Sequence, residues 1–376
     1  MLSQFGDLTD WLINQEDKPI DIGVCIASHI QDVDYAVAAE AQGFSHAWFA
    51  DSQMLWSDCY ACLAIAASRT KTIRLGTGVA ISGTRPAPVN AAAIATINAL
   101  APGRTFFGLG AGNTAMRVMG LPPQRLKDFE QYLTVVKPLL RGEEVMMPSP
   151  FGDRPIRHIM PEQGFVNFDS PIPLYVSGFG PKSLALAGRF GDGAVLSLPH
   201  SQAAMQGIWA ALSAGQDAEL DRDRFYTTAL TAIAILEPQE AVNSDRVVNL
   251  CGAMAMASVH YAYDQARNFG HQPPNLFAEI WEDYCALLAT YPEARRHQRI
   301  HLGHNCWVLP EELQFLTPAI HQGTCLIGTQ DQVLQRLFEL EQAGLKQVMN
   351  LPNFDTRYAS MASLSEKIIP NMPRLG

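Results

Sequence analysis

The chain has 376 residues, which is enough for one large domain or two ordinary ones. Hydrophobic residues make up 48% and charged residues 17% of it, a balance that favours a well-buried α/β core and argues against global disorder. The formal net charge is −10 and no local basic stripe is visible, which argues against nucleic acid as a partner.

No segment has the pattern of a membrane span or of an export signal. Residues 1–20 resemble a peripheral lead-in and lack the basic start and continuous apolar core of a signal peptide. No apolar run reaches the roughly 18 residues that a membrane span needs. We therefore expect a cytoplasmic protein with no membrane partner, in which the seven scattered cysteines are mostly small buried apolar side chains.

Short apolar segments alternate with segments of helical periodicity along most of the chain. The expected strands are Asp21–Ile26, His46–Ala50, a run from Ile73 to the Gly76-Thr77-Gly78 turn, Arg104–Leu109, Ile172–Ser177, Ala194–Leu198, a strand within Phe225–Leu236, and Gln347–Leu351. The expected helices are Asp32–Gln42, Ser57–Arg69, 90–100, Arg125–Arg141, Pro181–Phe190, Gln202–Ala214, Gln330–Ala343 and about Ser360–Ile369.

Residues 73–112 form the clearest unit, a strand, a helix and a second strand, which should be parallel. Eight such strands alternating with helices predict an α/β fold of the (β/α)8 TIM barrel type, with a doubly wound open sheet as the competing architecture. In either case the chemistry is expected at the carboxyl ends of the strands.

The pattern is that of a single domain over residues 1–376 with two departures from it. A segment rich in proline and glycine at 143–170 is expected to leave the barrel. A long, mostly helical insertion at about 238–322, which contains Trp281, Tyr284 and Trp307, is expected to cover the pocket and determine the substrate.

The turn after the fifth strand, Ser177-Gly178-Phe179-Gly180, leads into a helix that begins with Pro181 and Lys182. Unpaired backbone N–H groups and the positive end of a helix dipole can bind a phosphate there. The alternative is an ordinary strand–helix turn, and the sequence favours neither.

A second glycine turn, Gly76-Thr77-Gly78-Val79, ends the third strand. Glycines at this position allow a flat ring to approach the backbone closely. A simple bulge in the sheet explains the same pattern, and by itself it explains it better.

Polar residues follow several of the strands. Asp51 and Ser52 end the second strand, and Asp51 is a candidate hydrogen-bond partner or base, although a helix N-cap has comparable weight. Asn113 follows the fourth strand, where it can bond to a carbonyl, and Arg117 one turn later can reach an anion. His29, after the first strand, is a similar candidate for the pocket, although a histidine at such a position is more often only structural.

Three other patterns are weak. Gly108–Gly112 resembles a dinucleotide fingerprint with the wrong glycine spacing and no acidic residue after it. Cys59 and Cys62 have a C-x-x-C spacing but lack a second pair for zinc and a fold suited to redox chemistry. His297 and His301 share a helix spacing without an acidic partner, so we expect no metal.

Taken together, these segments resemble the luciferase-like monooxygenase superfamily, and within it the methylenetetrahydromethanopterin reductase-like branch. The resemblance is carried, in family order, by residues 36–52, 73–112, 173–196, 328–352 and 367–370. It spans nearly the whole chain except the helical segment before residue 322.

The resemblance implies a (β/α)8 barrel that binds FMN or the 8-hydroxy-5-deazaflavin coenzyme F420 at the carboxyl ends of the strands. It also implies a non-proline cis peptide near Gly78–Val79 that lies behind the ring, and a cofactor phosphate on Ser177–Gly180. Asp51, Asn113 and the loop 82–90 would line the ring and the substrate pocket.

Two residues depart from the family pattern. The deazaflavin-dependent sugar-phosphate dehydrogenases carry histidine where this chain has Ser52, and an acid where it has Asn113. The usual pair for acid–base chemistry on an alcohol is therefore missing, although the acid at Asp51 is kept.

Three functions are consistent with the resemblance. The first is a monooxygenase that uses reduced FMN and oxygen on a small organic substrate, with a flavin reductase as a partner. The second is a deazaflavin-dependent reductase that transfers hydride, and the third is a non-catalytic cofactor-binding barrel. The resemblance also implies a homodimer, for which the alanine-rich helices 58–69 and 90–100 are suited, although they suit packing within the barrel as well.

Overall fold

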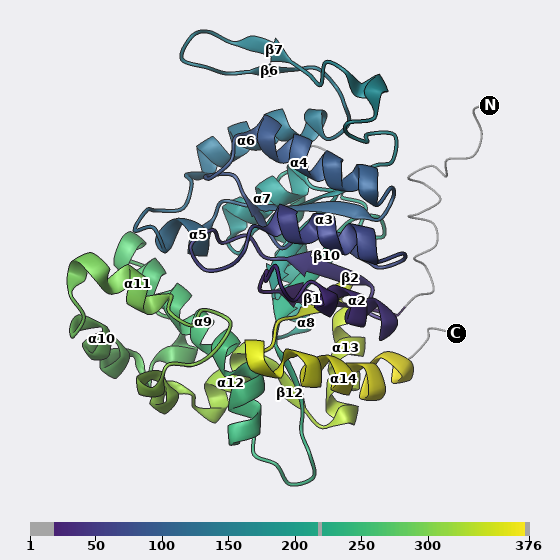
Figure 1. Cartoon of the computed structure of the whole chain (residues 1–376). Coiled ribbons are helices and arrows are strands. Elements are labelled where there is room, and N and C mark those ends of the chain that lie inside the picture. The colour runs from purple at the N-terminus through teal and green to yellow at the C-terminus, as the bar shows by residue number, and fades with distance from the viewer. Residues whose placement is uncertain (1–18, 217–219, 373–376) are drawn as a thin grey trace.

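The computed structural model describes residues 19–216 and 220–372, with helices arranged around a central sheet (Figure 1). The lead-in expected at residues 1–20 lies almost entirely outside the described residues. None of the described helices is both long and apolar enough to cross a membrane.

Eight parallel strands form a closed barrel. They are β1 Asp21–Ile26, β2 His46–Phe49, β3 Arg74–Thr77, β5 Thr105–Gly110, β8 Leu174–Ser177, β9 Gly193–Ser197, β10 Tyr226–Thr231 and β13 Gln347–Asn350. Their order is β3-β2-β1-β13-β10-β9-β8-β5, and β3 pairs back onto β5, which closes the ring. The predicted TIM barrel is confirmed, and both the open doubly wound sheet and a dinucleotide fold at Gly108–Gly112 are excluded.

The barrel helices agree with the predicted ones to within a few residues at their ends. They are α2 Asp34–Ala41, α3 Cys59–Arg69, α4 Ala87–Leu100, α6 Leu126–Leu139, α7 Pro181–Phe190, α8 Gln202–Ser213, α13 Gln330–Gln342 and α14 Arg357–Lys367. Their boundaries have local causes. The side chain of Thr329, for example, accepts a hydrogen bond from the Gln332 amide and caps α13, whose apolar residues Val333, Leu337 and Leu340 are buried.

Further short elements lie in the loops between the barrel strands and in the segment after β13. They are β4 Ala80–Ile81, α5 Asn113–Arg117, β6 Val145–Met147, β7 Arg154–Ile156, η1 Pro161–Gln163, η5 Phe354–Thr356 and η6 Ile369–Asn371. The antiparallel pair β6–β7 projects away from the barrel at the top of Figure 1, within the segment expected to leave it.

Residues 238–322 are helical, as their pattern predicts. They form α9 Asp245–Phe269, η2 Asn275–Phe277, α10 Trp281–Ala289, η3 Glu293–Arg295, α11 Arg296–Ile300, η4 Pro310–Phe315 and α12 Pro318–Thr324. The strand expected within 225–236 divides in two: β10 stays in the barrel, and β11 Ile233–Ile235 leaves it to pair with β12 Leu326–Gly328. This small parallel sheet holds the two ends of the helical segment together.

Aromatic side chains fill the lower part of the barrel. The ring centroids of Trp48 and Phe106 are 4.3 Å apart, and those of Tyr175 and Tyr226 are 5.3 Å apart. All four side chains are almost fully buried. Because such large rings need space, glycines stand beside them: a Cβ atom on Gly76 would lie 2.3 Å from the Phe106 ring.

The third strand bends sharply at its end. The peptide bond Gly78–Val79 is cis, as the family resemblance implies, and it joins β3 to the two-residue strand β4. After the bend, Ala80 and Ile81 pair with the upper half of β5. The bend therefore lies at the mouth of the barrel, above the aromatic rings.

We predict that Gly108→Ala destabilises the barrel by about 1–3 kcal/mol, because the added Cβ would lie 2.1 Å from the backbone oxygen of Thr77. Gly207→Ala is the matched control: this exposed glycine lies inside α8 with open space around its Cβ position, so the change should stabilise the chain by about 0.5–1 kcal/mol. Thermal unfolding midpoints measure both. Equal midpoints for the two variants would contradict this account of the packing.

Candidate active site

A cavity of about 880 Å³ opens at the carboxyl ends of the strands, a size typical of ligand pockets. Its wall is made by the loops that follow β2, β3, β5 and β8 together with α9 and the turn at 304–305. The predicted site residues that line it are Asp51, Ser52, Gly78, Val79, Asn113, Ser177, Gly178, Phe179 and Gly180. The fold therefore brings together nine of the thirteen candidates.

Gly76 and Thr77 are not among the residues that line the cavity. Thr77 is fully buried, and its hydroxyl donates a 2.6 Å hydrogen bond to the carbonyl of Gly108. Gly76 faces the Phe106 ring. Both residues lie one layer below the cavity, where they fix the start of the bend.

His29 and Arg117 also lie away from the cavity wall. His29 is exposed, with its ring 5.7 Å from that of Phe354. Arg117 is buried, and its Nε lies 3.4 Å from the Asp264 carboxylate on α9. Arg117 therefore points toward the helical segment.

The turn before α7 has the form of an anion site. A Cβ atom on Gly178 would lie 2.8 Å from the backbone of Ser183, so only glycine fits where the chain folds back onto the helix. The amide of Gly180 donates to the Ser183 hydroxyl at 3.1 Å. The first amides of α7 have no acceptor within the helix, and Lys182 lines the same part of the cavity. This end of the cavity suits a phosphate group.

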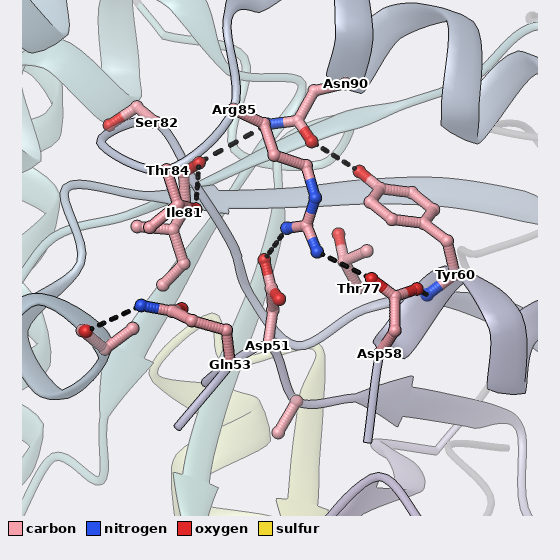
Figure 2. A network of polar contacts seen from close by, with 12 residues as sticks. Asp51, Gln53, Asp58, Tyr60, Thr77, Ile81, Ser82, Thr84, Arg85 and Asn90 are labelled. Atoms are coloured by element: carbon pink, nitrogen blue, oxygen red, sulfur yellow. Dashed lines mark hydrogen bonds and ion pairs between the residues drawn. The ribbon is translucent and has the colours of Figure 1, made fainter. Parts of the chain in front are cut away.

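Asp51 is paired with a residue that the sequence analysis did not single out. Arg85, from the loop before α4, contacts Asp51 Oδ2 at 2.5 Å through Nη1 and Asp58 at 3.0 Å through Nη2 (Figure 2). Burial raises the pKa of Asp51, and the hydrogen bond from Arg85 opposes that rise. Asp51 is therefore half of a buried ion pair at the cavity wall.

Arg85 is itself held from several sides. The Tyr132 hydroxyl donates to its backbone carbonyl at 3.1 Å, and its guanidinium lies 5.2 Å from the centre of the Tyr60 ring. The Asn90 amide nitrogen donates to the Tyr132 hydroxyl at 2.7 Å. The Asn90 amide oxygen accepts a hydrogen bond from the Tyr60 hydroxyl at 2.9 Å (Figure 2). The sequence shows that the loop 82–90 contains an arginine, Arg85. It does not show that this arginine pairs with Asp51.

The geometry disfavours a redox role for the C-x-x-C pair. Cys59 and Cys62 are free and buried on α3. Burial raises the pKa of Cys59 well above the usual range and that of Cys62 to about 11, so both are thiols at neutral pH. Cys59 packs beside Asp51, so it belongs to the wall behind the ion pair.

The helical segment covers the cavity with other residues than the aromatic ones expected. Tyr261, Gln265 and Phe269 of α9 line it, together with His304 and Asn305. Tyr284 is instead buried among the helices, and Trp307 is 53% exposed.

The histidines of this segment form no metal site. His301 Nε2 lies 3.7 Å from Asp264. Over residues 19–216 and 220–372, no group of three His, Cys, Asp or Glu side chains is placed to hold a metal ion.

The chain matches known families along most of its length. A family model described as luciferase-like monooxygenase matches residues 28–347. A 5,10-methylenetetrahydromethanopterin reductase from Archaeoglobus fulgidus is 30% identical over 345 residues, which are 90% of this chain and 94% of that protein.

Two further relatives match over shorter regions. A reductase of the same name from Methanolobus tindarius is 35% identical over 168 residues, 44% of this chain and 49% of its own. An F420-dependent glucose-6-phosphate dehydrogenase from Beutenbergia cavernae is 30% identical over 246 residues, 62% of this chain and 65% of its own. Both matches cover less than two thirds of the relative concerned.

Solved structures show the same fold. The coenzyme F420 dependent tetrahydromethanopterin reductase from Methanopyrus kandleri has a TM-score of 0.68 at 18% identity, over 95% of this chain and all of that one. The oxygenating constituent of 3,6-diketocamphane monooxygenase from Pseudomonas putida, in complex with FMN, has a TM-score of 0.59 at 15% identity, over 96% of this chain and all of that one.

We predict that Arg85→Gln destabilises the chain by up to about 3–5 kcal/mol at neutral pH, because Asp51 is left as an unpaired buried carboxylate. Without Arg85 the pKa of Asp51 rises further. The loss of stability should therefore grow as the pH rises through that pKa and shrink in acid, where Asp51 is protonated. Unfolding at several pH values measures the difference from wild type.

Two further variants control this prediction. The double variant Asp51→Asn/Arg85→Gln should recover much of the lost stability because both partners are then neutral. Arg69→Gln removes the exposed ion pair with Asp34 and should change stability by less than about 1 kcal/mol. A double variant no more stable than Arg85→Gln would refute the assignment of the deficit to Asp51.

Proposed function

Because the chain belongs to the luciferase-like monooxygenase family, in its methylenetetrahydromethanopterin reductase-like branch, we propose that it is a coenzyme F420-dependent oxidoreductase that transfers hydride to or from a small organic substrate. Membership of this family makes the chain an oxidoreductase. The choice of F420, the direction of transfer and the substrate class are parts of the proposal.

One observation carries the proposal: a single cavity contains both the glycine turn before α7 and the bend at Gly78–Val79. The turn suits an anionic tail, and the bend offers bare backbone against which a planar ring can lie. The two features are contributed by loops after β8 and β3. A cofactor with a phosphate at one end and a flat tricyclic ring at the other matches this arrangement.

The residues at the turn fit such a tail. The close approach of Gly178 to Ser183 leaves no room for a side chain, and Ser177 and Lys182 line the same wall. Gly110 faces Val79, where a Cβ would lie 2.9 Å from the valine methyl group, so the wall behind the bend is also tightly packed. Val79 is therefore held firmly where the ring would rest.

The names of the relatives favour the deazaflavin over FMN. The Beutenbergia relative, at 30% identity, is named as F420-dependent, and so is the Methanopyrus structure at 18% identity, whereas the FMN complex is a structure at 15% identity. A bound deazaflavin would supply or accept a hydride and does not support oxygen insertion. The FMN monooxygenase first expected remains the competing outcome of the test below, and it alone needs a flavin reductase as a partner.

Side chains at the cavity wall would orient the substrate, and one of them would exchange a proton with it. Asp51 and Ser52 line one side of the cavity and Asn113 another. Because Asp51 is paired with Arg85, its carboxylate is fixed in place, and Asn113 offers an amide in place of an acid. We propose Asp51 as the group that exchanges a proton with the substrate oxygen, and Ser52 and Asn113 as its hydrogen-bonding neighbours.

The proposed assembly is a homodimer in which α3 and α4 face the partner. Val89 and Leu100 on α4 are 51% and 50% exposed, which is consistent with a covered surface in the assembly. Sedimentation velocity of the full chain tests this, and a monomer at micromolar concentration would contradict it.

Parallel titration of the purified chain with F420 and FMN tests the cofactor. We expect micromolar binding of F420 and at least roughly tenfold weaker binding of FMN, followed by absorption and fluorescence. The reverse order would favour the FMN monooxygenase, and binding of neither would reject both enzymes. Oxidation of reduced F420 by a panel of ketones and pterins then measures turnover and excludes a non-catalytic barrel.

We predict that Gly178→Ala weakens F420 binding about tenfold or more, because the added Cβ pushes the turn away from α7. Gly207→Ala is the control, since this exposed glycine of α8 has open space around its Cβ position and is not among the residues that line the cavity. Equal affinities of the two variants, both folded by circular dichroism, would remove the phosphate site from this turn.

A further inference from the structure

A tight turn in the helical segment brings two adjacent polar side chains, His304 and Asn305, to the cavity wall. The amides of Cys306 and Trp307 both donate to the carbonyl of Gly303, at 2.8 and 3.0 Å. Asn305 has a φ of 53°, a left-handed conformation that asparagine adopts more readily than most residues. The left-handed backbone at Asn305 therefore sets the position of the His304 and Asn305 side chains at the cavity wall.

The turn is attached to the barrel at three points. The hydroxyl of Thr114 lies 3.2 Å from His304 Nε2. Trp56 donates from Nε1 to the sulfur of Cys306 at 3.4 Å, and the amide of Phe354 donates to the carbonyl of Cys306 at 2.8 Å. His304 and Asn305 are therefore fixed relative to the loops that follow β2, β5 and β13, and so relative to the proposed ring site.

The hydrogen bonds that His304 and Asn305 already make determine which of their donors and acceptors remain for a ligand. The Asn305 Nδ2 group can only donate, and it lies 3.0 Å from His304 Nε2, which must accept. Burial lowers the pKa of His304 to about 3, so at neutral pH the ring is uncharged and carries its proton on Nδ1. Among the described residues, neither His304 Nδ1 nor Asn305 Oδ1 has a partner, and both atoms are buried. One donor and one acceptor thus remain.

Cations lie elsewhere. Arg117 is turned toward Asp264 and away from the cavity. In the described part of the chain, the lysine and arginine side chains that line the cavity are Arg125 and Lys182, at the N-terminal ends of α6 and α7. Arg125 also pairs with Asp128 at 2.7 Å. These two cations therefore lie at the starts of α6 and α7, and the 304–305 turn carries no charged side chain.

We propose that His304 and Asn305 form a substrate subsite for an uncharged group that carries both a donor and an acceptor, such as a carboxamide or a ring lactam. The N–H of such a group donates to Asn305 Oδ1, and its carbonyl accepts from His304 Nδ1. A phosphate or carboxylate meets an acceptor and no cation here, so it is rejected. The inference rests on the proposed function, which makes this cavity the active site.

Binding of two probes to the full chain tests the subsite. Uracil offers a ring lactam, and glucose 6-phosphate offers an anion; saturation-transfer NMR and calorimetry measure both, with and without F420. We expect uracil to bind and glucose 6-phosphate not to compete with it. Asn305→Gly, which suits the left-handed backbone, should weaken uracil about fivefold to tenfold, the effect of one hydrogen bond.

Gln239→Gly is the matched control, because Gln239 is exposed and has a φ of 65°. It should leave the affinity for uracil unchanged. His304→Phe keeps a ring of similar size without the donor and should weaken uracil to a similar extent, so the subsite is tested even where one variant folds poorly.

Three outcomes overturn the subsite: no uracil binding to the wild-type chain, an unchanged affinity in Asn305→Gly, or competition by glucose 6-phosphate. Failure of F420 to bind, together with the expected uracil results, would instead reject the proposed function and leave the subsite standing.

Discussion

The structure depends on how the third strand meets the fifth. β3 closes the barrel by pairing with the start of β5, and it must then leave that pairing so that the upper half of β5 can bond to β4 instead. The aromatic side chains below fill the lower part of the barrel, and the cavity opens above them. The bend at Gly78–Val79 lies at the boundary between the packed interior and the cavity. The proposed positions of the cofactor ring and of the substrate are both defined relative to this bend.

The charges around the cavity are largely neutralised within the protein. Arg85 is shared between two carboxylates, and Arg117 is directed to α9. Burying these groups without partners would be costly, so each pair also fixes the segments it joins. Lys182 lines the cavity at the N-terminus of α7, where the helix dipole also favours an anion, and this is the end to which the proposed phosphate site is assigned.

The helical segment between β11 and β12 adds what the barrel lacks. Its two ends are joined by the small parallel sheet, so the whole segment is anchored as one unit over the strand ends. Through α9 and the 304–305 turn it supplies polar side chains to the same cavity that Ser52 and Asn113 line. Differences in substrate between relatives of this fold are thus expected to lie in this segment.

The sequence by itself determined the eight strands and the barrel helices, because these follow from apolar spacing and glycine positions within a few residues. The bend at Gly78–Val79 was expected from the family resemblance, and the sequence left the turn at Ser177–Gly180 open between a phosphate site and an ordinary strand–helix turn. Tertiary structure alone decided which side chains meet: Asp51 with Arg85, Arg117 with Asp264, and Thr114 with His304. Asp51 and Arg85 are 34 residues apart in the sequence, and Thr114 and His304 are 190 residues apart. Such contacts depend on the register of the closed barrel and on how the inserted helices pack across it, which no local pattern encodes.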